Sequence, residues 1–439
     1  MSEINDLYLE LSDSPVILED ERHIYVNRQT GKFYNSVTGI LSMIKNEFKS
    51  DDVIKGLLNQ YKGFVSWYET LNMPKEQMIE YLTLYVNYRQ FTDSEMAEYK
   101  GEQYKRYLKK IHDYLNIYEF KNEYEYLREV NKIEKNKNIY IKGDYSIMSA
   151  DEIKEMWKDM TDIANAYGNI VHITIERHIL KKQKINFDDH LYNEIFKHYL
   201  WIKENIQIFY KKYPFSNHSF TEYEIDVTLG ELMENIIESF ENNKINWGRC
   251  VVPEKRLLYK DLCGTTDVYV DLDAKNFGLG DHKTNKDFHM ENPFGQFLKP
   301  PFDQYEDTHF NIYTFQMSIY AYMIEQIFGK KLNFLYITYY SRKNSTFKIF
   351  DIDYKKDEAI WLINNYIDWI DRHKAKLLSS SLGELIKLKI KDVWMDNFTK
   401  EFMYFIKDNK GNDDKKLYIK FIDDYHYRFI NYNPLKDIT

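Results

Sequence analysis

The chain has 439 residues, 44% of them hydrophobic and 29% charged, with a formal net charge of −9 at pH 7. These values indicate a globular protein with either one large domain carrying insertions or two domains. No run of about 18 apolar residues occurs and the acidic N-terminus lacks an apolar segment, so neither a membrane span nor a secretory signal is predicted. We therefore expect a cytoplasmic protein of a bacterium or a phage-infected host cell, because the many Tyr, Lys, Ile and Asn residues suggest an AT-rich genome.

Cysteine content and charge limit the possible partners. Cys250 and Cys263 are too few for a disulfide scaffold or a cysteine metal cluster. The negative net charge argues at first against a polynucleotide partner, because phosphate binding draws on basic surface. However, net charge averages the whole surface, and a nucleic-acid-binding protein needs only a basic groove. The basic run at residues 105–110 fits such a groove or a solvated helix face equally well.

The N-terminal part of the chain predicts a hairpin followed by helices. In residues 16–35, two short apolar runs at 23–26 and 32–34 flank a turn signal. Ser36 then caps a helix that carries Ile40, Leu41 and Ile44 on one face. Residues 51–137 are rich in Tyr, Lys and Glu and predict a helical insertion, which either borders a substrate path or has a purely structural role.

The next helix carries the first candidate site residue. Ser149 and Glu152 have capping-box spacing and begin this helix. Farther along, Gly168, His172 and Glu176 are spaced four apart, so they share one face of a helix. The glycine lets another backbone or a ligand approach closely. A single histidine on a half-apolar helix is more often packed than functional, so this pattern alone does not define a site.

The segment 263–286 organises the rest of the chain. Apolar and polar residues alternate on both sides of turn formers at 273–276, which predicts two strands of a hairpin. Such a hairpin brings Asp267 close to Asp281, and Lys283 projects from the same face as Asp281. Two carboxylates in a partly desolvated place need a compensating charge. Their hard oxygen ligands favour magnesium or manganese.

Elements on either side of the hairpin add further candidates. Residues 250–258 predict a strand whose Glu254 either touches the site through water or is an exposed strand-end carboxylate. Residues 310–328 predict a helix that ends at Gly329 and has Gln316 and Tyr320 on one face.

The C-terminal part predicts two more strands and a helix before a segment of unassigned role. The strands lie at 332–341 and 346–354 and the helix at 357–378, and a C-terminal appendage follows at 379–439. The sequence has no G-x-x-x-x-G-K-[ST] phosphate loop, so we expect neither a nucleotide cofactor nor a motor of its own.

Three of these patterns occur together in one known family. The G-x-x-D pattern ending at Asp267 and the D-x-K-T pattern beginning at Asp281 resemble the core of the PD-(D/E)xK nucleases, in their RecB-like branch. The helix with His172 and the Q-x-x-x-Y helix with Gln316 resemble other marks of that branch, in the same order. The segment SVTGIL, which starts at Ser36, is similar to the N-terminal entry of phage RecB-like exonucleases and of the mitochondrial genome-maintenance exonuclease.

This resemblance implies a fold and a division of the chain. The fold would be α/β, with the restriction-endonuclease-like mixed central sheet of PD-(D/E)xK proteins flanked by helices and with helical insertions. An N-terminal hairpin and helix (1–50) would enter the nuclease domain, followed by a helical subdomain (51–148), the nuclease core (149–378) and the C-terminal appendage (379–439). Relatives with an iron–sulfur cluster need four cysteines, so no such cluster is expected here.

The resemblance also implies roles for individual residues. Asp267 and Asp281, with His172 and the backbone carbonyl of His282, would hold one or two Mg²⁺ or Mn²⁺ ions at the scissile phosphate. Lys283 would orient or deprotonate the attacking water, or neutralise charge on the phosphate.

Four further residues would surround this group. Gln316 would orient site groups and Tyr320 would contact the strand being cut. Glu176 would either contact a metal ligand without touching the metal itself or be a capped surface acid. Glu254 has the two interpretations given above.

The implied function is a metal-dependent DNA exonuclease in phage or bacterial DNA replication, recombination or repair. Its substrate would be DNA that is single-stranded or has a free end, and its partners a helicase, a recombinase or a single-strand-binding protein. Two alternatives remain open, namely a structure-specific endonuclease and a catalytically silent nucleic-acid-binding or structural protein of the same fold. Loss of a site residue would indicate the silent protein, and Asp267, Asp281, Lys283 and His172 are all present.

Overall fold

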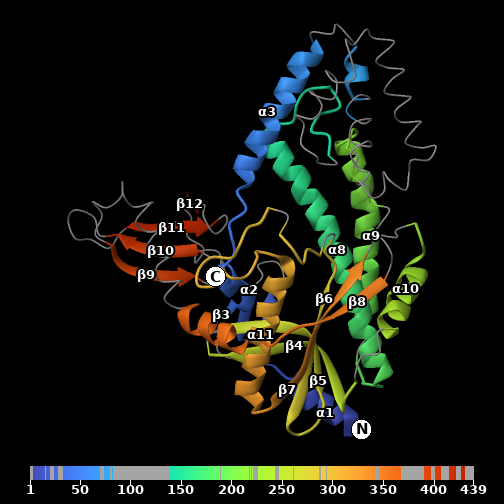
Figure 1. Ribbon diagram of the computed structural model, residues 1–439, viewed down its shortest axis with the longest axis vertical. Coiled ribbons are helices and arrows are strands. Elements are labelled where there is room, and N and C mark those ends of the chain that lie inside the picture. Colours follow the sequence, from blue (N-terminus) through green and yellow to red (C-terminus); the bar gives the residue numbers. More distant parts are fainter. Residues whose placement is uncertain are drawn as a thin grey trace.

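The structure of the protein is a computed structural model (Figure 1). It describes residues 3–14, 16–19, 24–27, 33–69, 74–79, 82, 138–187, 189–216, 218, 220, 226–242, 247–260, 262–285, 288–292, 294–341, 346–366, 390–396, 401–406, 415–421 and 427–430. The basic run at 105–110 and the second half of the helix expected at 357–378 lie outside these residues, whereas 356–366 are helical. Among the described residues, no helix combines the length and the apolarity needed to cross a membrane.

A mixed sheet of eight strands forms the centre of the described part of the chain. Its order is β1-β2-β3-β5-β6-β7-β8, and β4 pairs with β5 outside this path. The strands are β1 (Val16–Glu19), β2 (Ile24–Asn27), β3 (Phe33–Ser36), β4 (Cys250–Tyr259), β5 (Leu262–Asp271), β6 (Asn276–Lys283), β7 (Lys331–Ser341) and β8 (Thr346–Asp351). The pairs β3–β5 and β6–β7 are parallel and the others are antiparallel. Parallel strands need a crossover, and the helix after β6 supplies it for β7.

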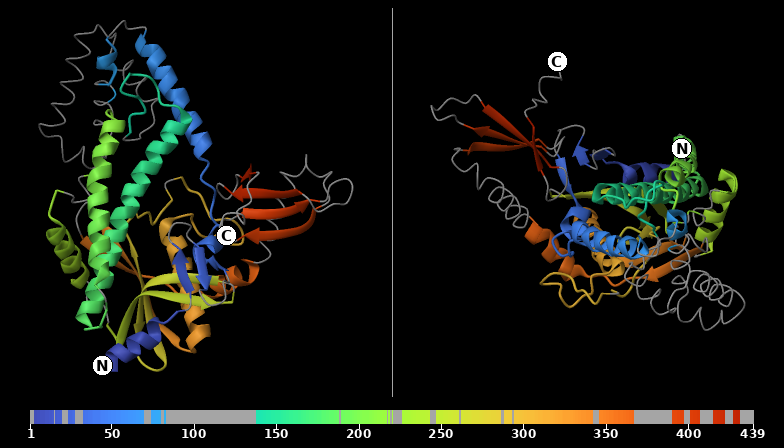
Figure 2. Two further views of the ribbon diagram at one scale, coloured as in Figure 1. Left: turned by 180° about the vertical axis from the view of Figure 1, so that it is seen from behind. Right: turned by 90° about the horizontal axis from the view of Figure 1, so that it is seen from above.

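Helices cover both faces of this sheet, as Figures 1 and 2 show. They are α1 (Glu3–Ser12), α2 (Val37–Leu41), α8 (Ala150–Lys182), α9 (His190–Lys212), α10 (Leu229–Glu241) and α11 (His309–Phe328). Helix α3 (Ser50–Glu69) packs against α8 instead, away from the sheet. Val268 and Val270 of β5 belong to one hydrophobic cluster with α8, α9 and α10. Tyr269, between them, belongs to the cluster on the opposite face with α2 and α11. The predicted mixed α/β architecture with flanking helices is therefore confirmed.

Local signals placed several elements correctly. β2 and β3 form the predicted hairpin, and Ser36 caps α2 by accepting a hydrogen bond from Thr38 N–H. Helix α2 ends at Leu41, so the expectation that Ile44 lies on this helix is wrong, although Ile44 is buried. The capping box of Ser149 and Glu152 begins α8. Gly329 ends α11 with a left-handed backbone at φ 65°.

Two features had no counterpart in the sequence patterns. Strand β1 adds to the predicted hairpin by pairing with β2. A second, four-stranded antiparallel sheet lies within the segment 379–439, in the order β12-β11-β10-β9. Its strands are β9 (Ile390–Asp396), β10 (Glu401–Ile406), β11 (Lys415–Phe421) and β12 (Tyr427–Ile430).

Candidate metal centre

The candidate site lies where β5 and β6 separate. The two strands pair as an antiparallel ladder that ends at Val268 and Gly280, one step before Asp267 and Asp281. Beyond this step, Asp281 and the next two residues of β6 pair with β7 alone. The Asp267 carboxylate spans the opening and accepts a hydrogen bond from the His282 backbone N–H at 2.6 Å. The two acids predicted from the hairpin therefore flank a fork in the sheet.

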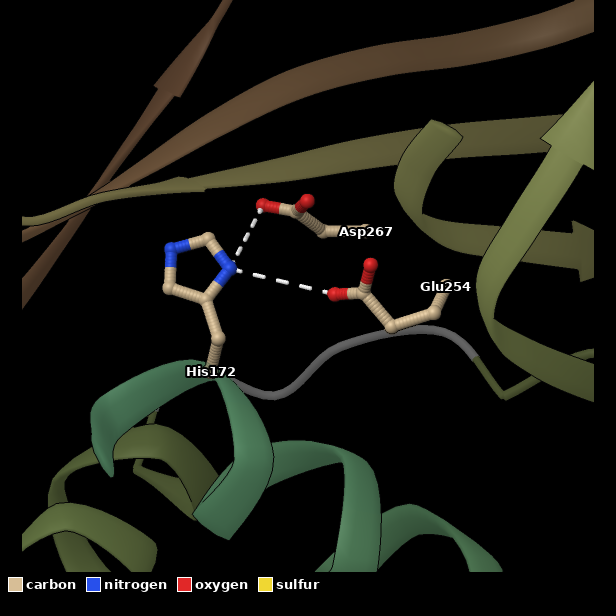
Figure 3. Close-up of side chains that lie close together, drawn as sticks. All are labelled: His172, Glu254 and Asp267. Atoms are coloured by element: carbon tan, nitrogen blue, oxygen red, sulfur yellow. Dashed lines mark ion pairs between the residues drawn. The ribbon is translucent and has the colours of Figure 1, made fainter. Parts of the chain in front are cut away.

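Strand β4 contributes an acid from the other edge of β5. Pro253 pairs with Val268 and Lys255 with Thr266, which leaves Glu254 opposite Asp267. The backbone of Glu254 has φ 48°, a left-handed conformation that is uncommon for a residue with a side chain. Its carboxylate points toward α8, as Figure 3 shows. The irregular backbone thus gives the site a third carboxylate.

Helix α8 brings His172 to these two acids (Figure 3). His172 Nδ1 lies 3.4 Å from Asp267 Oδ2 and 3.8 Å from Glu254 Oε1. One ligand atom from each of His172, Glu254 and Asp267 can be chosen so that all three lie within 4.8 Å of one another. Carboxylate oxygens suit Mg²⁺ and Mn²⁺, and an imidazole nitrogen suits transition metals such as iron, nickel and zinc. This mixed donor set therefore fits a divalent cation.

The close approach of α8 depends on Gly168. A Cβ atom at this position would lie 2.8 Å from Thr284 Oγ1. Thr284 directly follows Lys283, so the glycine lets the end of β6 approach the helix one turn before His172. The sequence pattern predicts another backbone or a ligand close to this glycine, whereas the structure places the Thr284 side chain there.

Asp281 and Lys283 form a second, adjoining group. Asp281 is 2% exposed and forms an ion pair with the Lys283 ammonium. The ammonium contacts Asp281 Oδ2, which accepts no other hydrogen bond among the described residues. Lys283 Nζ also lies 4.3 Å from the centre of the Tyr313 ring. The buried Asp281 carboxylate therefore already has a cationic partner in Lys283.

Burial and like charge raise the pKa values of the site acids. Burial and the neighbouring Asp267 raise the pKa of Asp281 to about 6. Burial and Glu254 raise the pKa of Asp267. For His172, burial lowers the pKa, but the carboxylates of Asp267 and Glu254 outweigh it and raise the pKa to about 9. Burial penalises the charged form of the two aspartates and the neighbouring carboxylates add to this penalty, and a bound cation would offset both effects.

The His282 side chain does not belong to the group of possible ligands. His282 is 2% exposed, and the centre of its ring lies 5.6 Å from the centre of the Phe240 ring. Its Nδ1 forms a 2.5 Å hydrogen bond with Thr338 Oγ1. Burial lowers its pKa well below the usual value. The N–H and C=O of one strand residue point to the same edge, so the His282 carbonyl faces the fork with the N–H that binds Asp267. The expected role for this carbonyl is thus compatible with the backbone.

Gln316 and Tyr320 lie behind β5. Gln316 Nε2 donates a hydrogen bond to the Tyr320 hydroxyl at 3.2 Å. The tyrosine ring occupies the space where a Cβ of Gly264 would lie, 2.5 Å from Tyr320 Cε1. Tyr320 is 2% exposed. The expected contact of this tyrosine with a nucleic acid strand therefore has almost no exposed surface to support it, and its observed contact is with the G-x-x-D strand.

The two remaining acids differ in their distance from the site. Glu254 Oε1 lies at an ion-pair distance of 3.8 Å from His172 Nδ1, so this carboxylate belongs to the group around the histidine. Glu176 lies one turn of α8 beyond His172 and is half-buried. Burial, Glu254 and Glu194 raise the pKa of Glu176 to about 8. It is not part of the three-residue group around His172.

Sequence reasoning missed Tyr313 and Asn285. The Tyr313 ring lies under the Lys283 ammonium, and its hydroxyl accepts a hydrogen bond from Asn285 Nδ2 at 2.7 Å. A signal for Tyr313 was present, because it lies three residues before Gln316 and so near the same face of α11. Asn285 follows the D-x-K-T pattern directly.

The chain matches no known protein family and no curated protein. One solved structure that resembles part of it is described as the crystal structure of SSO0001. That structure is 12% identical, covers 46% of this chain and 74% of its own, and superposes with a TM-score of 0.19. A similarity this weak supports no argument about fold or function, so the comparisons leave the family of this chain open.

Proposed function

We propose that the protein is a metal-dependent deoxyribonuclease with a PD-(D/E)xK fold. One observation carries the proposal: the fork between β5 and β6 gathers His172, Glu254 and Asp267 beside the Asp281–Lys283 ion pair. Acids, an imidazole and an ammonium at one point are the groups that phosphodiester hydrolysis requires, because the attacking and departing oxygens both carry negative charge. The antiparallel β4-β5-β6 strands and the parallel β6–β7 pair around α11 support the proposed fold.

His172, Glu254 and Asp267 are the residues that would hold a divalent cation, with Asp281 and the His282 carbonyl beside them. When bound, Mg²⁺ or Mn²⁺ supplies positive charge for the scissile phosphate and lowers the pKa of a coordinated water. Asp267 has a second task, because its hydrogen bond to His282 N–H fixes the distance between β5 and the strand with Lys283.

Lys283 acts as a cation in this proposal. Burial lowers its pKa, but the carboxylates of Asp281 and Asp267 raise it further, so the pKa lies above its ordinary value. The ammonium therefore stays protonated at neutral pH. It then orients the attacking water or neutralises charge on the phosphate, and of the roles considered from the sequence, proton abstraction is the one that this charge state disfavours.

An exonuclease is favoured over an endonuclease within this function. The support comes from the histidine helix and the Q-x-x-x-Y helix, which occur here in the order typical of RecB-like nucleases, where end-processing enzymes predominate. Gln316 and Tyr320 pack behind the site in this proposal and hold β5 in place.

The test is digestion of end-labelled single-stranded and double-stranded DNA and of a closed circle, with Mg²⁺, with Mn²⁺ and with a chelator. We expect cleavage of linear DNA that requires the metal and is lost in Lys283→Met. Lys275→Met is the matched control, because Lys275 is exposed in the turn at the other end of the same hairpin. Cleavage by Lys283→Met at the wild-type rate, or no cleavage by the wild type with either metal, would refute the proposal. Efficient cutting of circles would identify an endonuclease.

A further inference from the structure

The connection between β6 and α11 displays aromatic rings to solvent. We call residues 288–292 and 294–308, which the structure describes, the rim loop. Within it Phe294 is 83% exposed and Phe297 is 51% exposed. Phe48, in the segment before α3, is 70% exposed. Single exposed apolar residues are common, but two exposed aromatic rings within four residues of one loop form a group that can serve as a binding surface.

The backbone of the rim loop is held by hydrogen bonds on both sides of its exposed rings. Asn292 N–H donates to Glu306 Oε2 at 2.8 Å, and Leu298 N–H donates to the Tyr305 carbonyl at 2.9 Å. The Phe297 carbonyl accepts a hydrogen bond from Asn46 Nδ2 at 2.7 Å. Its ring is nevertheless half exposed. The loop is thus ordered before any ligand binds, which lowers the entropy that binding would cost.

The rim loop begins close to Lys283, because the Phe288 ring stacks on the Tyr313 ring with centroids 6.1 Å apart. The chain leaves β6 at Lys283, and Asn285 binds the Tyr313 hydroxyl under the lysine ammonium. The loop returns at Thr308, the N-cap of α11, the helix that carries Tyr313. In Figure 1 the loop runs beside α2, where Lys299 N–H donates to the Ile44 carbonyl at 2.8 Å. The exposed rings therefore lie on the connection between β6 and α11, the two elements that carry Lys283 and Tyr313.

We propose that the rim loop is a stacking surface for the bases of an unpaired DNA strand. The inference rests on the nuclease function proposed above and specifies the substrate as single-stranded. Every base has a π-face that an aromatic ring can stack on, whereas in a duplex those faces are covered by neighbouring bases. Lys45, Lys49 and Lys299 are exposed near the rings, but so are Glu47 and Glu291. Stacking, more than charge, is therefore what this surface offers.

A nucleic acid fits this surface better than a protein does. Phe294 and Phe297 are three residues apart in a loop where Gln296 and Lys299 are also exposed, and Met290 is the other exposed large apolar side chain of its described residues. Protein interfaces have a contiguous apolar centre with a polar rim. Two rings three residues apart in the sequence offer positions for stacking bases but do not form an apolar centre of that kind.

The test measures the affinity of labelled oligonucleotides in the presence of a chelator, at one salt concentration. The probes are an oligothymidylate, an abasic oligonucleotide of the same length and a blunt duplex. Each stacked base contributes enough that Phe294→Ala/Phe297→Ala should weaken oligothymidylate binding by about tenfold or more. Its affinity for the abasic probe should equal that of the wild type. Phe196→Ala is the matched control, because Phe196 is 45% exposed on α9, and it should bind like the wild type.

Two outcomes overturn the inference: wild-type affinity of the double variant for oligothymidylate, or equal wild-type affinity for oligothymidylate and the abasic probe. The first of these would make the rings candidates for a protein contact. Because the assay contains no metal, it is independent of cleavage. Failure of the wild type to cut DNA with either Mg²⁺ or Mn²⁺ would refute the nuclease proposal alone, and wild-type cutting combined with unchanged binding by the double variant would refute the stacking surface alone.

Discussion

The carboxylate of Asp267 and the backbone N–H of His282 are joined by a 2.6 Å hydrogen bond across the fork between β5 and β6. Oδ2 of Asp267 makes this bond and is also the oxygen that lies 3.4 Å from His172 Nδ1. One carboxylate oxygen therefore connects the helix, the first strand and the second strand of the site. Changes at Asp267 should consequently affect both cation binding and the position of β6.

Cation binding should stabilise the folded protein. A cation at a hundredfold excess over its Kd adds about 2.7 kcal/mol to the free energy of unfolding, if it binds only the folded state. We expect Mn²⁺ to raise the melting temperature of the wild type and to have little effect on Asp267→Asn. Asp353→Asn is the control, because that side chain is 86% exposed and distant in sequence from the site. Equal Mn²⁺ stabilisation of wild type and Asp267→Asn in a thermal melt would contradict this ligand assignment.

Cation affinity should increase with pH. The metal-free protein holds a proton on His172 below its pKa of about 9, and a cation that uses this nitrogen must displace that proton. For one displaced proton, the affinity should rise by about tenfold per pH unit below that pKa and level off above it. Titration calorimetry with Mn²⁺ between pH 7 and pH 9 measures this slope. In His172→Gln the slope should flatten, and a flat profile in the wild type would show that the imidazole is not a ligand.

Tyr313 should position Lys283 through its ring. A cation over an aromatic face contributes about 0.5–2 kcal/mol, so Tyr313→Leu should lower kcat by about threefold to thirtyfold. Tyr313→Phe keeps the ring and loses only the hydrogen bond from Asn285, so it should retain most of the activity. Steady-state kinetics on linear DNA, with thermal melts of both variants, separates this role from a purely structural one. If Phe and Leu reduce kcat equally, the ring does not hold the ammonium.

Gly168 should be required for packing against Thr284. In a helix, Gly→Ala alone stabilises by about 0.8–1 kcal/mol, but a Cβ at this site would lie 2.8 Å from Thr284 Oγ1. We expect Gly168→Ala to destabilise the wild type and to stabilise the Thr284→Ala variant. Gly63→Ala in α3 is the control, because no atom lies within 4 Å of its added Cβ, and it should stabilise in both backgrounds. Chemical denaturation measures the free energy of unfolding of each variant. The same effect of Gly168→Ala in both backgrounds would disprove the clash.

Features of the fold that depend on neighbouring residues could be predicted from the sequence. The capping box at Ser149, the left-handed stop at Gly329 and the alternation in 263–286 each act within a few residues. Strand β1 escaped prediction because its four residues carry too short a pattern to be distinguished from a loop. The end of α2 before Ile44 was also missed, since an apolar residue can be buried just as well beyond a helix end.

The candidate site could be predicted where it depended on the hairpin. Asp267, Asp281 and Lys283 followed from strand alternation, whereas His172 was selected through the resemblance to RecB-like nucleases, because its helical spacing alone does not define a site. The direct contact of Glu254 could not be foreseen, because it depends on one left-handed residue within a strand.

The position of Tyr313 could not be predicted for a different reason. The placement of its ring under Lys283 depends on how α11 crosses β6, which is a property of packing and not of spacing within either element.

The parallel pairing of β6 with β7 also has a consequence for how the protein is made. The residues from Asp281 to Lys283 pair with Ile337 to Tyr339, which are translated more than fifty positions later. A nascent chain on the ribosome can close the hairpin as soon as β6 has emerged, but the end of that strand gains its partner only after α11 has also been synthesised. The site should therefore mature late in translation, and a fragment that stops before β7 should lack it even though every one of the side chains that form it has already been made.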